Sequence, residues 1–217
     1  MRKYPLDRQI LQGLGCTTDD FDIVSDDELS SVSALGHRIA AHCFVWSPSD
    51  RVITIGSTKC SMKALVLMHL RFDGRLGFFG GLVEAGESPS VAVTREMKEE
   101  MNLDTNRFAI NEADHLLSQV NHARKLLAHF YVLSVPAAEM DEIEKNTFDT
   151  MRSGDENFGV VRVPLYTMPD GVGGFPSFLS QNFAASSKSQ LTYALARLGI
   201  LSVDYINRSL EMSRRYK

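Results

Sequence analysis

Hydrophobic residues recur at short, regular intervals along much of the chain, and their spacing predicts a series of strands. Over residues 37–46 apolar and polar positions alternate, which is typical of a strand buried on one face. Later runs are short, rich in Val, Ile and Leu, and bounded by turn residues, as buried strands are. We predict strands over 37–46, 51–55, 63–70, 114–120, 126–134 and 160–166.

The predicted helices lie between and after these strands. Residues 88–101 have helical spacing, with Ser88 as a candidate N-cap and Pro89 in the first turn. Turn residues precede this helix at 72–74 and at 79–81. We also predict helices over 137–145, 175–183 and 190–198, a loop over 171–174, and a last helix that carries Arg208, Arg214, Arg215 and Lys217.

These elements divide the chain into a polar N-terminal arm and one mixed α/β domain. Residues 1–35 are polar, with acidic runs at 19–22 and 25–28, and we predict an arm with one short helix. Residues 36–217 contain no internal repeat and no Pro- or Ser-rich linker, so we interpret them as a single domain.

Composition and charge exclude several classes of protein. The 217 residues are 44% hydrophobic and 23% charged, which is ordinary for a globular protein. No apolar run reaches the ~18 residues of a membrane span, so we expect an intracellular protein with no membrane partner. The net charge of −4 gives no general attraction to RNA, which a local basic patch would have to hold. Cys16, Cys43 and Cys60 form no CxxC pair and are predicted to be free thiols.

The helix predicted over 88–101 contains three glutamates within five consecutive positions, Glu96, Glu99 and Glu100. Residues three or four apart share one side of a helix, so these like charges destabilise it by roughly 0.2–0.5 kcal/mol per pair. A solvated helix face is the ordinary explanation of such a cluster. The residues around it favour a different explanation.

The spacing around the cluster resembles the Nudix box, G-x5-E-x7-R-E-U-x-E-E-x-G-U, in which U is a bulky aliphatic residue. Gly81, Glu87 and Arg95 occupy its first specified positions, and the three glutamates occupy its remaining charged positions. The departure is Asn102, where the family usually has Gly. Because Asn tolerates positive φ better than most residues, the helix should still end there. The resemblance implies the Nudix fold, a mixed β-sheet sandwiched between helices.

The box residues suit a site for divalent cations. Gly80 and Gly81 permit a tight backbone path, and the resemblance implies that the Gly80 carbonyl binds a cation. Glu96 and Glu100 are one helical turn apart and can share ions, with Glu99 beside them. Hard cations such as Mg²⁺ or Mn²⁺ prefer these oxygen ligands, and we expect two or more ions. The ions would remove the repulsion within the cluster.

The same residues predict hydrolysis of a pyrophosphate bond. Bound cations acidify water and neutralise charge on phosphate oxygens, and a glutamate can orient or deprotonate the attacking water. Arg95 and Glu87 are spaced to pair, and the resemblance implies that they brace a loop against the helix. We therefore predict Glu87, Arg95, Glu99 and Glu100 as the catalytic residues.

The resemblance extends from about residue 37 to residue 198. "RFDGRLGFFGG" (71–81), "AHFYVL" (128–133) and "VRVPLYTMPDGVGGFPSFL" (161–179) resemble the Nudix subgroup that decaps small nucleolar RNA and hydrolyses inosine diphosphates. The non-catalytic protein syndesmos is a relative of that subgroup. The resemblance implies substrate-binding roles for His42, Arg71, Phe78 and Gln190, and metal-binding roles for Gly80, Glu96, Glu99, Glu100 and Gln119.

One of these assignments departs from the family pattern. Gln119 occupies the position of a metal-binding histidine, and His122, three residues away, could replace it only through a shift of register. His69 and His129 lie in predicted strands, and we interpret both as structural.

The leading hypothesis is a metal-dependent hydrolase of purine nucleoside diphosphates (IDP and dIDP) and of the 5′ cap of RNA. The subgroup implies a homodimer found in the nucleus, nucleolus and cytoplasm. One alternative is a Nudix hydrolase that prefers ADP-ribose or another dinucleotide. A second alternative is a non-catalytic RNA-binding adaptor like syndesmos, which is expected to have lost the glutamates that this chain retains.

Overall fold

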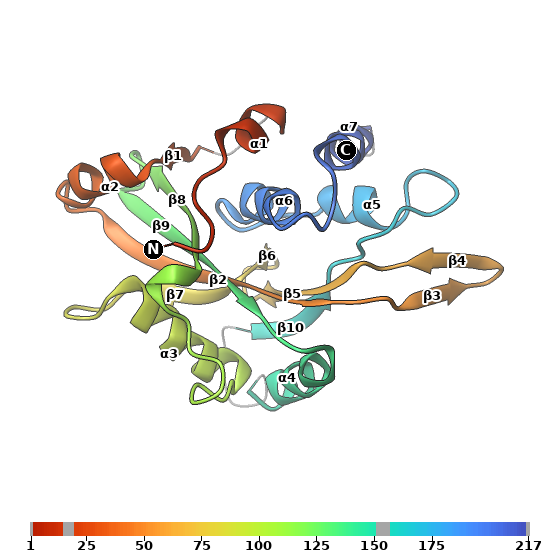
Figure 1. The fold of residues 1–217 in the computed structure, drawn as a ribbon, viewed down its shortest axis with the longest axis horizontal. Helices are drawn as coiled ribbons and strands as arrows, with labels where there is room; N and C mark the ends of the chain where they lie inside the picture. The colour runs from red at the N-terminus through yellow and green to blue at the C-terminus, as the bar shows by residue number, and fades with distance from the viewer. Residues whose placement is uncertain (1, 15–19, 151–156, 216–217) are drawn as a thin grey trace.

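Eight strands form one mixed sheet with helices on both faces (Figure 1). The computed structural model describes residues 2–14, 20–150 and 157–215. The strands of the sheet are β1 (Asp22–Val24), β2 (Arg38–Pro48), β5 (Ala64–Arg71), β6 (Leu76–Gly77), β7 (Phe79–Leu82), β8 (His115–Asn121), β9 (Leu126–Ser134) and β10 (Asn157–Arg162). β3 (Val52–Ile55) and β4 (Thr58–Ser61) form a separate hairpin.

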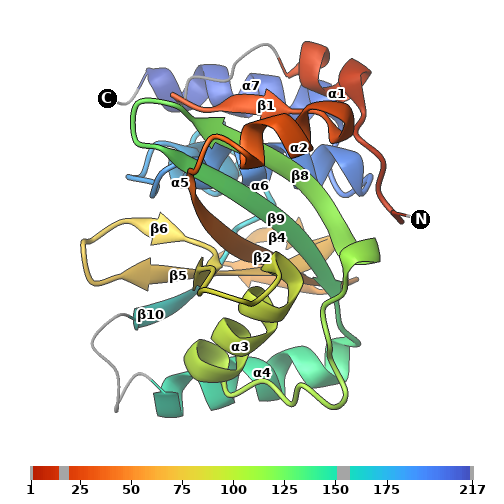
Figure 2. The ribbon, with the colours of Figure 1, turned by 90° about the vertical axis from the view of Figure 1, so that its left-hand side faces the viewer.

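The helices lie in two layers, one on each side of the sheet. In Figures 1 and 2, α3 and α4 lie on one face, and α1, α5, α6 and α7 lie on the other. The helices are α1 (Arg8–Gly13), α2 (Asp26–Ser33), α3 (Pro89–Met101), α4 (Ala137–Thr150), α5 (Phe175–Leu179), α6 (Ser187–Arg197) and α7 (Val203–Arg214), with a short 3-10 turn at Glu112–Asp114. The predicted α/β fold, a mixed sheet between helices, is confirmed.

The alternation of side chains along the strands explains why both faces are covered. In β5, Leu65 and Leu67 pack with residues of α3 and α4, whereas Val66 and Met68 pack with residues of α5, α6 and α7. Successive strand residues point to opposite faces, so a fully buried strand supplies two hydrophobic cores at once. β9 divides in the same way, with Phe130 in one core and Tyr131 in the other. The near-continuous hydrophobic runs in the sequence follow from this arrangement.

One edge of β2 pairs with two different strands. β2 runs parallel to β9 over residues 38–46, which leaves its other edge for antiparallel partners. That edge pairs with β7 over residues 40–43 and then with β5 over residues 45–48. The change of partner places the β7 glycines opposite the start of β2, with Gly80 paired to His42.

The structure corrects four predicted elements. Residues 79–81, predicted as a turn, belong to β7, because Gly80 continues the pairing with β2 at φ +134°. The helix predicted over 175–183 ends at Leu179. The helix predicted over 137–145 continues to Thr150, and the strand predicted over 160–166 spans Asn157–Arg162.

The first 35 residues contain more structure than one short helix. β1 pairs with β8 at the edge of the sheet, and α1 and α2 flank it along the chain. Cys43 and Cys60 are free and buried, whereas Cys16, Asp19 and Lys217 lie outside the described residues. In the described parts of the chain, helices as long and apolar as a membrane crossing requires are absent.

Candidate active site

Helix α3 carries the glutamate cluster, and its two ends follow from the sequence. Ser88 precedes the helix and its Oγ accepts the N–H of Val91 at 3.4 Å, while Pro89 begins the first turn. Asn102 ends the helix in the left-handed region, at φ 50° and ψ 38°. The prediction that Asn would end the helix at positive φ is confirmed.

Two glycines of β7 allow the backbone to pass directly beside the glutamates. A Cβ atom on Gly80 would lie 2.1 Å from the carbonyl oxygen of Ala41, and one on Gly81 would lie 2.4 Å from Oε1 of Glu96. The N–H of Gly80 donates to Oε2 of Glu100 at 2.7 Å. Any larger residue at 81 would meet the Glu96 carboxylate, so glycine here serves the site.

Arg95 joins α3 to the loop that follows β7. Its guanidinium donates to Glu87 at 2.9 Å, to Glu96 at 2.9 Å, and to the carbonyl of Leu82 at 3.3 Å. The bond from Arg95 holds the pKa of Glu87 below its usual value, and Glu87 in turn raises the pKa of Arg95. The predicted Arg95–Glu87 pair is present, and Arg95 also fixes the Glu96 carboxylate.

A cavity of about 800 Å³ brings most of the predicted site residues together. It is a half-open hollow that reaches from α3 across the strands to α6. Its lining contains these residues of the predicted site: His42, Arg71, Phe78, Gly80, Glu96, Glu100 and Gln190. The side chains of Glu96 and Glu100 are 14% and 10% exposed, so both carboxylates are largely buried where they line the cavity.

Other predicted residues lie outside that cavity. Glu99 has a side chain that is 59% exposed and pairs with Arg95 at 3.4 Å. The side chain of Gln119 is buried and donates to the hydroxyl of Ser189 at 3.1 Å, in a separate small hollow beside α6. His122 is exposed in the β8–β9 turn, against the ring of His37. The Gln119 side chain thus faces Ser189 of α6, and it does not line the cavity that contains Glu96 and Glu100.

The predicted base-binding residues occupy the α6 side of the cavity. His42 is half-buried in β2, and burial, with a smaller effect of Arg71, lowers its pKa to about 4. Phe78 is 1% exposed and packs against Phe44 and Phe130, so it is a fixed apolar wall. Gln190 is 2% exposed within α6. At neutral pH the imidazole of His42 is therefore uncharged and able to donate or accept a hydrogen bond.

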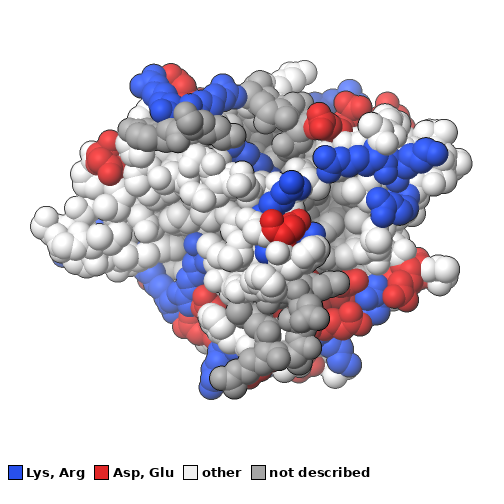
Figure 3. Space-filling model, turned by 180° about the vertical axis from the view of Figure 1, so that it is seen from behind, with Lys and Arg blue, Asp and Glu red and all other residues white. Residues whose placement is uncertain are grey.

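Sequence reasoning missed a group of arginines at the cavity. Arg38, Arg75 and Arg124 line it together with Arg71. The guanidinium of Arg71 lies 5.4 Å from the ring centre of Phe72, whose side chain is 54% exposed. In the view of Figure 3, basic side chains gather across the middle and right of that face of the molecule. Of the arginines in the cavity lining, Arg38 and Arg124 lie far along the chain from the stretch 71–81 that contains Arg71 and Arg75, so no local motif indicated them.

Sequence reasoning also missed His69, which lies in the cavity lining beside Glu100. Its Nδ1 is 3.9 Å from Oε1 of Glu100, and its side chain is 2% exposed. Burial, with a smaller contribution from Arg71, lowers the pKa of His69 to about 3. The sequence had suggested an ordinary core histidine, because an isolated His in an apolar strand gives no other signal.

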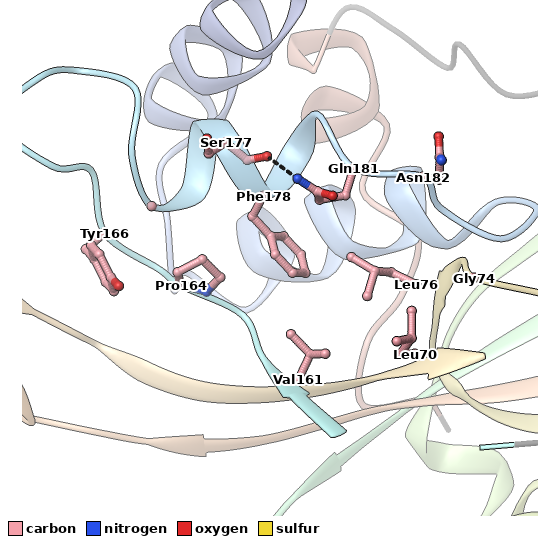
Figure 4. Close-up of a pocket in the computed structure, with 11 residues that line it drawn as sticks. Leu70, Gly74, Leu76, Val161, Pro164, Tyr166, Ser177, Phe178, Gln181 and Asn182 are labelled. Atoms are coloured by element: carbon pink, nitrogen blue, oxygen red, sulfur yellow. Dashed lines mark hydrogen bonds between the residues drawn. The ribbon is translucent and has the colours of Figure 1, made fainter. Parts of the chain in front are cut away.

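A second hollow, of about 450 Å³, lies between β5, β10 and α5 (Figure 4). The side chains of Leu70, Leu76, Val161 and Phe178 point into it, and Gln181 donates to the carbonyl of Ser177 at its rim. Its lining includes neither a carboxylate nor a histidine. It therefore offers apolar contact, and the acid–base groups belong to the larger cavity.

The residues of the larger cavity fit a divalent cation. Glu96 and Glu100 face it, Gly80 and Gly81 leave room beside them, and His69 presents buried nitrogen atoms with no hydrogen-bond partner. Within the described residues, no group of three or more His, Cys, Asp or Glu side chains stands close enough together to hold a metal ion, so the two glutamates would need other ligands. Mg²⁺ commonly binds through one or two carboxylates, with water and substrate phosphates as its other ligands. Two carboxylates at the end of a cavity match that mode of binding.

Comparison with known proteins agrees with this geometry. A family model described as Nudt16-like, U8 snoRNA-decapping enzyme-like, matches residues 39–201. A U8 snoRNA-decapping enzyme of Homalodisca vitripennis is 40% identical over 163 residues, which are 75% of this chain and 86% of that protein. The U8 snoRNA-decapping enzyme of Xenopus laevis is 37% identical over 187 residues, 85% of this chain and 87% of that protein.

A second kind of relative has a different name. The human Tudor-interacting repair regulator protein is 34% identical over 150 residues, which cover 69% of this chain and 70% of that protein. The residues that the family model matches include Gly80, Glu96 and Glu100. Helix α3 and the glycines beside it therefore lie within the part of the chain that the family model matches.

Proposed function

The chain belongs to the Nudt16-like family of Nudix hydrolases, and on that premise we propose that it is a divalent-cation-dependent pyrophosphohydrolase. Its proposed substrates are inosine-type purine nucleoside diphosphates and the 5′ cap of RNA. The observation that carries the proposal is the composition of one cavity. Glu96 and Glu100 of α3, the neutral His42, the buried Gln190 and several arginines line the same 800 Å³ space.

The phosphates and the base of a nucleotide require different binding groups, and the cavity contains groups suited to each. Glu96 and Glu100 would hold the cations, and Arg95 keeps the Glu96 carboxylate in place. A bound cation supplies positive charge next to the phosphates and makes water more acidic. The arginines of the lining are suited to the remaining phosphate oxygens, because guanidinium groups bind phosphate through paired hydrogen bonds.

The base would lie against Phe78 near His42 and Gln190. Inosine has a carbonyl oxygen and a ring N–H where adenosine has an amino group and a bare nitrogen. A neutral histidine and an amide can each donate and accept hydrogen bonds, so together they can match the inosine edge. A buried polar group that is left without its partner costs about 1–3 kcal/mol, which is the source of selectivity.

Capped RNA is supported by the relatives and by the open shape of the site. Two relatives that cover most of this chain are U8 snoRNA-decapping enzymes. Arg38, Arg75 and Arg124 are exposed where they line the cavity, so they are accessible to a chain of phosphates that continues beyond the cap. Exposed Phe72 adds an aromatic surface on which a base can stack.

The experiment that tests the proposal is a substrate panel at one fixed Mn²⁺ concentration. The panel contains IDP, dIDP, ADP, ADP-ribose, m7G-capped RNA and NAD-capped RNA. Wild type is compared with Glu96→Gln, and with Glu142→Gln as a control that removes an exposed carboxylate from α4. We expect chelator-sensitive turnover of IDP, dIDP and capped RNA by wild type and by the control, and little turnover by Glu96→Gln.

Three results would contradict the proposed function. Preferential turnover of ADP-ribose would replace the purine diphosphate assignment with the ADP-ribose alternative. Binding of capped RNA with no turnover of any substrate would indicate an adaptor. Full activity in the presence of excess chelator would overturn the role of the cations.

A further inference from the structure

His69 lies at the base of the active-site cavity, on the same face of the sheet as α3. In the sheet, His69 of β5 is paired with Gly77 of β6 on one side and with Val160 of β10 on the other, so a neighbouring strand lies on each side of it. The ring packs against Phe79 with centroids 4.8 Å apart, and the side chain is 2% exposed. The imidazole therefore has a fixed position next to the glutamates of α3.

Both ring nitrogens of His69 are buried without a hydrogen-bond partner. Such burial is unfavourable, because a polar group removed from water and left unpaired costs about 1–3 kcal/mol. His115 and His129, also buried in the sheet, each have at least one hydrogen-bonded ring nitrogen, although Nδ1 of His115 has no partner. Nε2 of His115 and Nδ1 of His129 each bond to the hydroxyl of Ser118, at 2.9 and 3.1 Å. A structural role explains His129, but it leaves the nitrogens of His69 unexplained.

The position of each His69 nitrogen shows which one faces the site. Nε2 lies toward the backbone of Gly77, where an added Cβ would be 3.1 Å away. Nδ1 lies toward Glu100, 3.9 Å from Oε1. That separation is too long for a hydrogen bond. It is within the ~4.2 Å that two ligands can span across one ion, since each bond to the ion is about 2.1 Å long.

We propose that His69 is a ligand of the divalent cation that Glu100 holds, and that it binds this cation through Nδ1. The inference rests on the proposed function, which places cations at Glu96 and Glu100. It adds a nitrogen ligand to a site otherwise made of oxygen atoms. Imidazole suits Mn²⁺ better than Mg²⁺, so the site should favour Mn²⁺ when substrate is absent.

The test is pulsed electron paramagnetic resonance of Mn²⁺ bound to the full chain, with Mn²⁺ and Mg²⁺ affinities from calorimetry. Coupling of Mn²⁺ to the nitrogen of a ligand is visible directly and does not depend on turnover. The variants are His69→Gln and His129→Gln, of which the second removes a buried histidine outside the cavity lining. Glu100→Gln is the control for the location of the ion.

We expect ¹⁴N coupling in wild type and in His129→Gln, and its loss in His69→Gln. The Mn²⁺ affinity of His69→Gln should fall by about tenfold or more, with a smaller change for Mg²⁺. If His69→Gln does not fold, ¹⁵N-labelled histidine in wild type and in His42→Ala, which removes the other histidine of the cavity lining, tests the same ligand. A change from ¹⁴N to ¹⁵N coupling supports a histidine ligand, and absence of coupling overturns it.

The results also separate this inference from the proposed function. Mn²⁺ that binds to wild type, is lost in Glu100→Gln and shows no histidine coupling would overturn the His69 ligand alone. Coupling that persists in His69→Gln would assign the nitrogen to another histidine and also overturn it. A wild-type protein that binds no Mn²⁺ would overturn both the inference and the metal dependence of the proposed function.

Discussion

Gly81 and the carboxylate of Glu96 are so close that a side chain on residue 81 has no space. A Cβ atom at Gly81 would lie 2.4 Å from Oε1 and 2.6 Å from Cδ of Glu96. Arg95 donates to the same carboxylate at 2.9 Å. The strand β7 and the arginine therefore hold the carboxylate of Glu96 from two directions, and a change at residue 81 acts directly on the proposed cation ligand.

Replacing Gly81 by alanine should reduce activity more than stability. The backbone of Gly81 has ordinary φ, so the strand tolerates alanine, but the methyl group must displace the flexible end of Glu96. We expect kcat/KM to fall by about tenfold or more, while the free energy of unfolding changes by less than ~1 kcal/mol. Gly159→Ala is the matched control, because a Cβ there meets Leu70 at 3.8 Å. Equal activity in the two variants would contradict the role of Gly81.

Replacing Glu100 by glutamine should abolish most of the catalysis and leave the fold intact. The amide oxygen can still accept the Gly80 N–H, but the negative charge that attracts a cation is lost. We expect kcat to fall by at least ~10², because that charge acts mainly in the transition state. Removing a like charge from the helix should not reduce its stability. Turnover near the wild-type rate would exclude Glu100 from the metal site.

Substitutions of Asn102 test how helix α3 ends. Its φ of 50° is in the left-handed region, where a Cβ without a local hydrogen-bonding group costs about 1 kcal/mol relative to Gly. Asn102→Gly, which restores the family residue, should leave the unfolding free energy equal or slightly higher. Asn102→Ala should lower it by about 1 kcal/mol. Chemical denaturation of the two variants measures the difference, and a more stable alanine variant would contradict this explanation of the helix end.

The sequence predicted the site best where a single helix determines it. The spacing of Glu87, Arg95 and Glu96 depends on helical periodicity and one loop, and the structure shows the ion pairs that this spacing allows. Ser88 and Asn102 were interpretable for the same reason, since capping is local chemistry. The long strands were equally clear, because buried strands leave continuous apolar runs.

Features that depend on distant contacts could not be predicted in this way. Gln119 falls on the expected strand, but its side chain faces Ser189 of α6, and neighbouring elements decide that contact. β1 is three residues long, too short for a periodic pattern, and it forms only by pairing with β8. The sequence around His69 does not indicate its neighbours, because only the folded chain brings Gly77 and Glu100 close to it.

The buried histidines predict a loss of stability in mild acid. The folded state lowers the pKa of His115 to about 3 and that of His129 to about 4, chiefly through burial. The unfolded value is about 6.5, so below that pH the unfolded chain binds more protons than the folded one. The stabilisation is complete above pH ~6.5 and is lost as the pH falls toward 4, by up to ~1.4 kcal/mol per pH unit for each histidine.

The measurement is urea unfolding between pH 4.5 and 7.5, for wild type and for His129→Gln. Glutamine can still bond to Ser118 but does not titrate, so the variant should show a shallower dependence of unfolding free energy on pH. Because His115 and His129 approach within 3.4 Å, they should titrate as a coupled pair. Parallel pH profiles for the two proteins would show that His129 is already protonated or solvated in the folded state.

The last prediction concerns the choice of base. If His42 and Gln190 meet the inosine edge, adenosine leaves at least one of these polar groups without its partner. IDP should therefore exceed ADP in kcat/KM by about tenfold or more, and His42→Ala should remove much of that margin. The cation site should be unaffected, because Glu96 and Glu100 project from α3 and keep their contacts with Arg95 and Gly80. His122→Ala is the control, since that histidine is exposed in the β8–β9 turn. Equal hydrolysis of ADP and IDP by the wild-type protein would reject the purine assignment and favour ADP-ribose as the substrate.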